Sequence, residues 1–348
     1  MNVVVILLFT YFIASLLTRY MLLYTQRNGL LDIPNDRSSH SRPTPLGGGV
    51  GIVLAFLLMV AILLELARIV RGLGIALLVG GCVLAIIGWL DDRKGISALL
   101  RLMVHIASAL WAVYWIGGLP YLRLGPYTLE LGHWGSALSV IGIVWMINLY
   151  NFMDGIDGLA GAEAATVGAF AGLFSAAIGK WDLAILCWVL SVASLGFLRW
   201  NWPPARIFMG DVGSGFLGFT FATLAIASEN SGGLPLILWM SLLGVFIVDA
   251  TITLVSRMVR GERLAAAHRE HVYQLAVQAG YSHKSVTTAV LFLNCVIAVI
   301  TWVCLHSQGQ WAIMLILLGW LALLLTHHVL RQRFRTNQTT LKKPSFKS

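Results

Sequence analysis

The chain has 348 residues, of which 58% are hydrophobic and 11% are charged, and its formal net charge is +9. Soluble proteins carry about 25% charged residues, so this composition excludes a soluble domain and predicts an integral membrane protein. The cations are scattered over loops without interleaved aromatic residues, which argues against nucleic-acid binding. The four cysteines all lie in apolar runs and lack metal-binding or redox spacing, so we expect buried apolar side chains.

Apolar runs near the ~20 residues that a spanning helix needs recur along the whole chain. Eleven spans are predicted, and ten is an alternative because the fifth and eighth runs are short. The first run has no basic start and no small-residue cleavage site, so we expect a retained helix. We therefore expect one all-α polytopic membrane domain over residues 1–330 and a basic tail over 331–348. The runs are 3–24, 47–66, 73–90, 99–117, 135–150, 160–179, 181–198, 214–228, 234–256, 286–306 and 311–329.

The distribution of Lys and Arg predicts the orientation, because cytoplasmic loops are enriched in these residues. One side of the membrane would hold the loops 25–46, 91–98, 148–159, 199–213 and 257–285 together with the tail. That side carries 19 of the 24 cations, including Arg101 at the start of a helix, and the opposite side carries four. We therefore expect the N-terminus outside, the C-terminus in the cytoplasm and contact between the basic face and anionic membrane lipids.

Acidic residues gather at the same cytoplasmic edge, although the orientation of the chain in the membrane does not require Asp or Glu there. Ionisable groups at membrane depth are costly and mark functional sites by default. Several converging carboxylates would repel one another unless a cation lay among them. Mg²⁺ with a phosphorylated substrate meets this need, because Mg²⁺ takes few carboxylates and completes its shell with water and phosphate oxygens. The ten acids are Asp32, Asp36, Asp91, Asp92, Asp154, Asp157, Asp211, Asp249, Glu262 and Glu270.

Two loops supply the first candidate residues. "WLDDRKG" places Asp91 and Asp92 at the end of the third run, although charges at an aqueous helix end would look the same. "NLYNFMDGIDGLAG" carries Asn148, Asn151, Asp154 and Asp157 after an apolar run, and the two acids share one face if the segment is helical. Helix packing through small residues explains the glycines here but not the amides and acids.

Two further loops complete the set. "RIFMGDVGSGFLG" places Asp211 before a helix that Ser214 opens, which suits a metal–phosphate ligand. A plain Asp or Ser N-cap is the alternative. "RGERLAAAHREHVYQL" offers His268, Arg269 and His271 for phosphate contact, or a solvated basic loop. The "GGGVG" run at 47–51 is better explained by close helix packing than by a nucleotide fold.

These loops, in this order, resemble the polyprenyl-phosphate N-acetylhexosamine-1-phosphate transferase family. The segment "DIPNDRSSHSRPTPLGGG" is similar to the first cytoplasmic loop of that family. The resemblance implies transfer of a sugar 1-phosphate from a UDP-sugar to undecaprenyl phosphate, with release of UMP and with Mg²⁺ or Mn²⁺. It also implies a site on the cytoplasmic face of the bacterial inner membrane, and a homodimer is an assembly to consider.

The resemblance also implies roles for single residues. Asp211 would be the metal ligand, with Asp154 as a second candidate, and Asp91 and Asp92 would be the catalytic carboxylates. Asn151, Asp154 and Asp157 would line the same cleft. The sequence departs from the family in the last loop, where Tyr273 and Gln274 stand in place of further histidines around His271. This pattern is closer to the O-antigen-initiating branch, with a UDP-GlcNAc or UDP-N-acetylfucosamine type of donor.

A transporter with Glu163 and Asp249 as an ion relay is the competing class. A transporter should place broken helices near the midplane in two matching halves, whereas this chain shows no internal repeat. For the transferase, we expect direct attack by the lipid phosphate rather than a covalent intermediate on Asp92. The lipid phosphate is already anionic and can act as the nucleophile itself.

Overall fold

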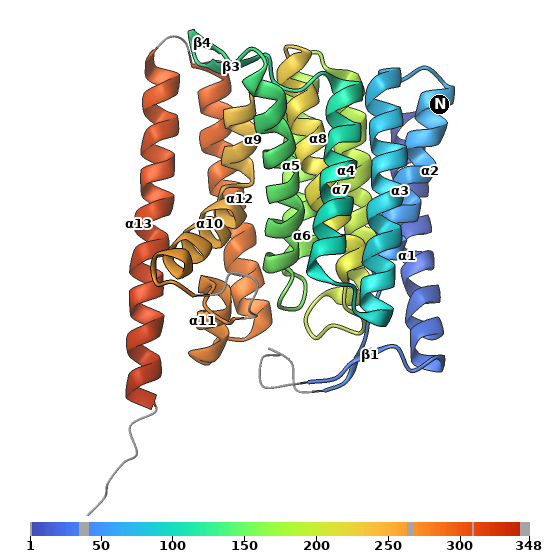
Figure 1. Ribbon diagram of the computed structural model, residues 1–348, viewed down its shortest axis with the longest axis vertical. Helices are drawn as coiled ribbons and strands as arrows, with labels where there is room; N and C mark the ends of the chain where they lie inside the picture. Colours follow the sequence, from blue (N-terminus) through green and yellow to red (C-terminus); the bar gives the residue numbers. More distant parts are fainter. Residues whose placement is uncertain (1, 35–41, 263–267, 308–309, 342–348) are drawn as a thin grey trace, which may run out of the picture.

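The computed structural model describes residues 2–34, 42–262, 268–307 and 310–341. These residues form a bundle of helices that run side by side, with two short antiparallel hairpins (Figure 1). The hairpins pair β1 (Leu31–Asp32) with β2 (Thr44–Pro45) and β3 (Tyr121–Leu124) with β4 (Tyr127–Glu130). The helices are α1 (Val3–Arg27), α2 (Val50–Glu65), α3 (Arg71–Lys94), α4 (Ala98–Ile116), α5 (Trp134–Met153), α6 (Leu159–Ala177), α7 (Trp181–Asn201), α8 (Asp211–Asn230), α9 (Leu236–Leu242), α10 (Gly244–Val259), α11 (Val272–Gln278), α12 (His283–His306) and α13 (Gln310–Leu341). The helical fold class is confirmed.

Ten of the predicted apolar runs each fall on one helix, and the ninth falls on two. The length and composition of the described helices support nine or ten spans, in line with the alternative of ten. In the described ranges, nine helices are long and apolar enough to cross a membrane, or ten if one bent pair counts as a span. The two short runs, now α5 and α8, are 20-residue helices that meet this test. The helix that falls short is α2, which has 16 residues.

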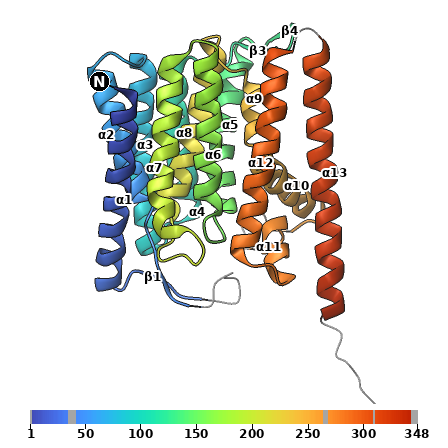
Figure 2. The same ribbon diagram turned by 180° about the vertical axis from the view of Figure 1, so that it is seen from behind.

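The ninth run, 234–256, was predicted as one spanning helix, and the prediction of one continuous helix is wrong, although the bent pair can still count as one span. The structure breaks it into α9 and α10, which meet at Leu243 with a bend of 83°. Figures 1 and 2 show α10 running obliquely across the bundle. Hydropathy measures how apolar a segment is but not the direction in which it runs. Helix α10 carries two polar side chains, Asp249 and Arg257, that are buried in the protein interior, where they can be paired.

The polar loops of the chain gather at one end of the bundle, which we call the β1 end. Figure 1 shows β1, the end of α3, the loops after α5 and α7, and α11 at this end, with the N-terminus and the β3–β4 hairpin at the other. The loops that the cation count assigned to one side therefore lie together. The cytoplasmic location of that side stays a prediction.

Helix α8 lies at the centre of the bundle and packs on α3 and α5. Of an 18-residue stretch of α8, 83% is buried, compared with 11% in α13. Small residues allow this approach: a Cβ added to Gly218 would meet the carbonyl oxygen of Met146 at 2.2 Å, and one added to Gly49 would meet the Cα of Gly213 at 2.5 Å. The expectation that the "GGGVG" run serves helix packing is therefore confirmed.

At the periphery, α13 continues as a helix past residue 330, where the tail was expected to begin.

A buried ion pair fastens the β3–β4 hairpin to the bundle at the end opposite β1. The carboxylate of Glu229 is fully buried and accepts hydrogen bonds from the backbone N–H of Arg123 at 2.7 Å and from its Nε at 3.0 Å. The backbone N–H of Leu236 donates to the other oxygen at 2.5 Å. Glu229 thus joins the hairpin, the end of α8 and the start of α9.

Candidate active site

Two carboxylates meet where α8 begins. Asp211 is the first residue of α8, and the carboxylate of Asp92, from the last turn of α3, accepts hydrogen bonds from the backbone N–H groups of Asp211 (2.8 Å) and Val212 (3.3 Å). The first N–H groups of a helix have no partner within the helix and carry a partial positive charge. Asp92 therefore caps α8 from a neighbouring helix, and the alternative of a plain Asp211 or Ser214 N-cap is wrong.

Gly210 makes this arrangement sterically accessible. It occupies the N-cap position of α8 with φ 79° and ψ 170°, a backbone region that is essentially restricted to glycine. A Cβ at this position would lie 2.4 Å from Oδ2 of Asp92. Any side chain at residue 210 would consequently push the Asp92 carboxylate away from the helix terminus.

Arg101 supplies a cation between two of the carboxylates. Its Nη1 lies 2.6 Å from Oδ2 of Asp91 and 3.4 Å from Oδ2 of Asp211. The Asp91 and Asp211 carboxyl groups also lie within hydrogen-bonding reach of each other. From the sequence, Arg101 was predicted only to be one of the cations on the cytoplasmic side. A cation at the start of an apolar helix, ten residues after Asp91, was the clue to its role.

The predicted amides lie beside this cluster. Asn151 donates from Nδ2 to Oδ1 of Asp211 at 2.6 Å and to the hydroxyl of Ser214 at 3.2 Å. Asn148, one turn earlier on α5, donates to the carbonyl of Val144 and lines the same cavity as Asn151. The expected convergence of the second and third loops therefore holds for these two residues.

The acids after α5 separate from each other. Asp154 ends α5 and faces the cluster: removal from water, followed by repulsion from Asp211 and Asp92, raises its pKa to about 8. Asp157 lies elsewhere, with His283 Nδ1 3.1 Å from its Oδ1 and the N–H of Ala205 donating to its Oδ2 at 3.0 Å. The two acids would share a face only in a helical segment, and that condition is not met because the helix stops at residue 153.

A polar cavity of about 390 Å³ opens in front of Asp211. We use "polar cavity" for this space, which is lined by residues from α3, α4, α5, α8 and the loop before α11. Its lining includes the second site residue that sequence reasoning missed, His105, one turn after Arg101 on α4. The polar lining residues are Arg101, His105, Asn148, Asn151, Asp211, His268, His271 and Gln274.

An apolar groove of about 520 Å³ adjoins the polar cavity and shares Asn148 and Phe152 with it. The remaining lining residues of this apolar groove are Ile106, Val140, Ile141, Val144, Trp145 and Leu254. A ligand with a charged head and an apolar tail would match this pairing of spaces.

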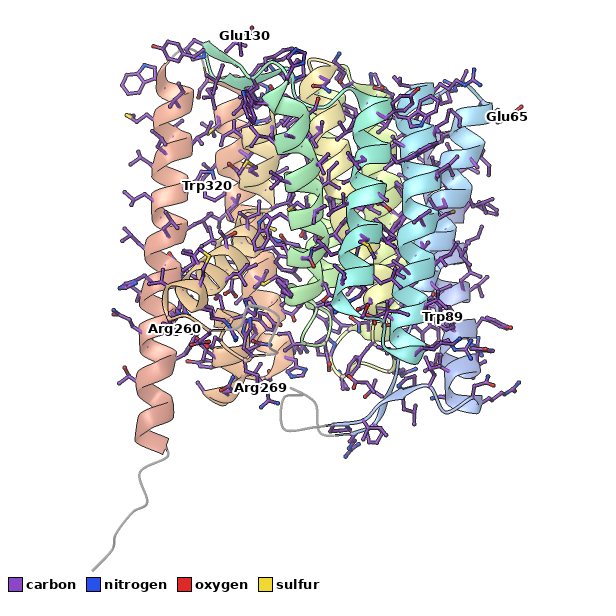
Figure 3. All side chains as sticks on the ribbon, viewed as in Figure 1. Glu65, Trp89, Glu130, Arg260, Arg269 and Trp320 are labelled. Carbon is purple, nitrogen blue, oxygen red and sulfur yellow. The ribbon has the colours of Figure 1, made fainter. Side chains whose placement is uncertain are left out.

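The loop before α11 contributes two of its three predicted residues. His268 and His271 line the polar cavity, and their rings lie 4.9 Å apart between centroids. Burial, together with the nearby His271 and Arg257, lowers the pKa of His268 to about 4, so its ring is neutral near pH 7. Arg269 is not among the residues that line the cavity, and Figure 3 labels it at the β1 end near α11.

The donor set suits Mg²⁺ better than a metal that needs a complete protein cage. Across the described residues, no group of three His, Cys, Asp or Glu is arranged to hold a metal ion. The site instead brings the carboxylates of Asp91 and Asp211 to the guanidinium of Arg101, and the carboxylate of Asp92 lies beside Asp211 at the start of α8. Mg²⁺ commonly uses one or two carboxylates and takes its other ligands from water and phosphate, so an excess of carboxylates beside an open cavity fits it.

The two residues of the transporter alternative lie apart from this cluster. Glu163 of α6 accepts a hydrogen bond from Nδ2 of Asn294 on α12 at 2.6 Å, within the helix packing. Asp249 accepts the backbone N–H of Val272 at 2.9 Å. Neither residue lines the polar cavity.

The chain is similar to known membrane transferases. Residues 74–229 match the model of glycosyl transferase family 4, a range that contains Asp91, Asp92, Asp154 and Asp211. A "probable undecaprenyl-phosphate N-acetylglucosaminyl 1-phosphate transferase" of Bacillus subtilis is 28% identical over 81% of this chain and 79% of its own length. The "decaprenyl-phosphate N-acetylglucosaminephosphotransferase" of Mycobacterium tuberculosis H37Rv is 30% identical over 75% of this chain and 72% of its own length.

A third relative, the "undecaprenyl-phosphate alpha-N-acetylglucosaminyl 1-phosphate transferase" of Escherichia coli O157:H7, is 26% identical over 88% of this chain and 85% of its own length. The similarity therefore extends over most of the chain and includes the carboxylate cluster. With the apolar helices, it identifies a multi-pass membrane enzyme that transfers a sugar phosphate. The chain belongs to the polyprenyl-phosphate N-acetylhexosamine-1-phosphate transferases of glycosyl transferase family 4.

Proposed function

We propose that this enzyme transfers an N-acetylhexosamine 1-phosphate from a UDP-sugar to undecaprenyl phosphate, releases UMP and starts a lipid-linked envelope polysaccharide such as O-antigen. One observation carries the proposal: a polar cavity lined by the Asp211 carboxylate and the Arg101 guanidinium adjoins an apolar groove. A water-soluble nucleotide fits the first space and a lipid tail fits the second. Asn148 and Phe152, which line both, mark where the two substrates would meet.

The donor that the relatives favour is UDP-N-acetylglucosamine, because all three are named for N-acetylglucosamine transfer. UDP-N-acetylfucosamine is the second candidate. It is supported by the last loop, where Tyr273 packs inward and its hydroxyl donates to the carbonyl of Phe152 at 2.9 Å instead of presenting another imidazole to the cavity.

Mg²⁺, or Mn²⁺ in its place, would be held by Asp211 with Asp91, and Asp154 is close enough to take part. The bound ion would neutralise charge on the donor diphosphate and on the departing UMP. Asn151 orients the Asp211 carboxylate through its 2.6 Å hydrogen bond. Arg101 would add positive charge on the cavity wall, and His271 would offer a ring nitrogen there, because phosphoryl transfer depends mainly on positioning and on charge neutralisation.

The chemistry we propose is one direct displacement. An oxygen of the lipid phosphate attacks the phosphorus that carries the sugar, a new P–O bond forms, and the bond to the UMP phosphate breaks. A covalent route would need a free carboxylate nucleophile. Asp92, the residue best suited by sequence, has both oxygens engaged by the N–H groups of Asp211 and Val212, which argues against that route.

The orientation we propose places the β1 end on the cytoplasmic side of the bacterial inner membrane. The cation asymmetry of 19 to four supports it. A cytoplasmic site would also give direct access to nucleotide sugars.

A transfer assay tests the proposal. Purified protein in detergent is incubated with undecaprenyl phosphate, Mg²⁺ and single radiolabelled UDP-sugars: N-acetylglucosamine, N-acetylfucosamine, N-acetylgalactosamine and glucose. We expect labelled lipid and equimolar UMP with one of the N-acetylated donors and no product without lipid or metal. Failure of every N-acetylhexosamine donor in protein that retains its fold would overturn the proposal.

A further inference from the structure

A buried carboxylate behind the polar cavity joins three helices. Asp249 of α10 is 5% exposed and accepts the first two backbone N–H groups of α11, those of Val272 (2.9 Å) and Tyr273 (3.4 Å). The hydroxyl of Thr253 donates to it at 3.3 Å. Asp249 therefore anchors the beginning of the short helix that follows His271.

Two imidazoles flank the same carboxylate from opposite elements. Nδ1 of His271 lies 3.6 Å from Oδ1 of Asp249, and Nε2 of His327, on α13, lies 3.4 Å from the same oxygen. Both rings are buried, at 3% and 7% exposure. His271 lines the polar cavity, whereas His327 does not, so His327 reaches the cavity only through Asp249 and His271.

A second contact from α13 holds the same loop. Arg331, one turn after His327, lies with Nη2 3.4 Å from Oε2 of Glu270, and its Nη1 donates to the hydroxyl of Ser256 at 3.0 Å. Glu270 directly precedes His271. Helix α13, at the edge of the bundle, therefore contacts Glu270 of the cavity loop through Arg331, and it contacts Asp249 of α10 through His327.

At 3.6 Å the Asp249 carboxylate contacts the His271 ring without a hydrogen bond, and this buried contact favours the orientation in which the ring lines the cavity. The orientation of the Asp249 carboxylate depends in turn on the N–H groups and side chains that contact it. Three hydrogen bonds hold the Asp249 carboxylate, so without His327 it would lose a buried neighbour beside Oδ1, and the His271 ring that lies against the same oxygen could shift.

We propose that His327 is a positioning residue for the transfer reaction: through Asp249 it sets the orientation in which His271 faces the donor phosphates. This inference rests on the proposed function for its kinetic consequence, but the contact chain itself is independent of the substrate. It gives α13 a part in catalysis although the helix lies at the edge of the bundle and does not line the polar cavity.

The kinetic test compares three variants of α13. His327→Ala should lower kcat/KM for the donor by about 10- to 100-fold, the usual effect of losing a residue that orients a ligand side chain, with no change in KM for the lipid. His327→Gln keeps an N–H donor and most of the volume, so we expect recovery to within about threefold of wild type. His328→Ala is the matched control, because this histidine is the next residue on α13 and is exposed.

A double-mutant cycle separates positioning from general loss of packing. In a His271→Ala background, His327→Ala should have less than about a twofold further effect, because non-additivity is expected of residues that act through one another. Equal fold losses in both backgrounds, or equal losses for His327→Ala and His328→Ala, would overturn the proposal.

A measurement made without substrate distinguishes the positioning role of His327 from the proposed transferase function. The ring signals of ¹⁵N-labelled histidine, with that of His271 assigned by its loss in His271→Ala, should shift in His327→Ala and stay in place in His328→Ala. An unchanged His271 signal would refute the positioning role whatever the activity. A shifted signal in a protein that uses no sugar nucleotide would refute the proposed function and leave the contact chain intact.

Discussion

Replacing Gly210 by alanine should abolish most of the activity although every ionisable group of the site remains. The new Cβ would lie 2.4 Å from Oδ2 of Asp92, so the carboxylate has to move away from the start of α8. Its hydrogen bonds to the N–H groups of Asp211 and Val212 would then lengthen or break. Because Asp211 is the first residue of α8, the candidate metal ligand would move with the helix terminus.

The expected cost follows from two contributions. A non-glycine residue in this backbone region costs about 1–3 kcal/mol, and losing a hydrogen bond to a charged group costs about 1.5–3 kcal/mol. Together they lower the free energy of unfolding by about 3–6 kcal/mol. Displacement of reacting groups by about 1 Å can lower turnover by roughly 100-fold, so we expect a loss of at least that size.

Gly232→Ala provides the control. Gly232 also has a positive φ, 69°, but a Cβ there would meet nothing within 4 Å, and it follows α8 at the opposite end of the bundle. The control should lose about 1–2 kcal/mol of stability and keep its turnover. Thermal unfolding in detergent and UMP release measure the two quantities. Turnover of Gly210→Ala within about threefold of Gly232→Ala would refute the capping role of Asp92.

Three further predictions follow from other parts of the molecule. Glu229→Ala should destabilise the protein by about 3–5 kcal/mol, because it leaves Arg123 without its buried partner; an unchanged melting temperature would contradict this. His268 has a pKa of about 4 in the folded protein and about 6.5 when unfolded, so the unfolded chain binds more protons and stability should fall as the pH drops from 6.5 to 4. In His268→Gln the fall in melting temperature between pH 6.5 and 4 should become smaller by the contribution of His268. A melting profile identical to that of wild type would rule out this contribution. In a background without natural cysteines, a cysteine at Gly95 should react only from the cytoplasm and one at Tyr127 only from outside; the reverse pattern would invert the proposed orientation.

The sequence was sufficient for the helical class and for the gathering of the acids, because both depend on composition and on which loops share a side. Asn151, Asp154 and Asp211 converge as expected. The bend between α9 and α10 did not follow from the sequence, because an apolar run of the right length has the same hydropathy whether straight or broken. It places Asp249 behind the cavity loop instead of along a spanning helix.

Individual carboxylates were harder to assign than the cluster. Asp91 and Asp92 are adjacent, yet one pairs with Arg101 and the other caps α8. That difference depends on how α3 packs against α4 and α8. Asp157 was grouped with Asp154 through a helical spacing that ends at residue 153, and it contacts His283 instead. Such partners come from tertiary packing, which spacing along the chain does not encode.

Asp211→Asn tests the central claim, that the carboxylate cluster holds the metal for sugar-phosphate transfer. The substitution keeps the size of the side chain and its place beside Asn151 but removes the charge. UMP release is measured over a Mg²⁺ titration with undecaprenyl phosphate and the donor that wild type uses. We predict turnover lowered by at least about 100-fold at every Mg²⁺ concentration, in protein that inserts and melts like wild type. Near-normal turnover at low Mg²⁺ would contradict the account.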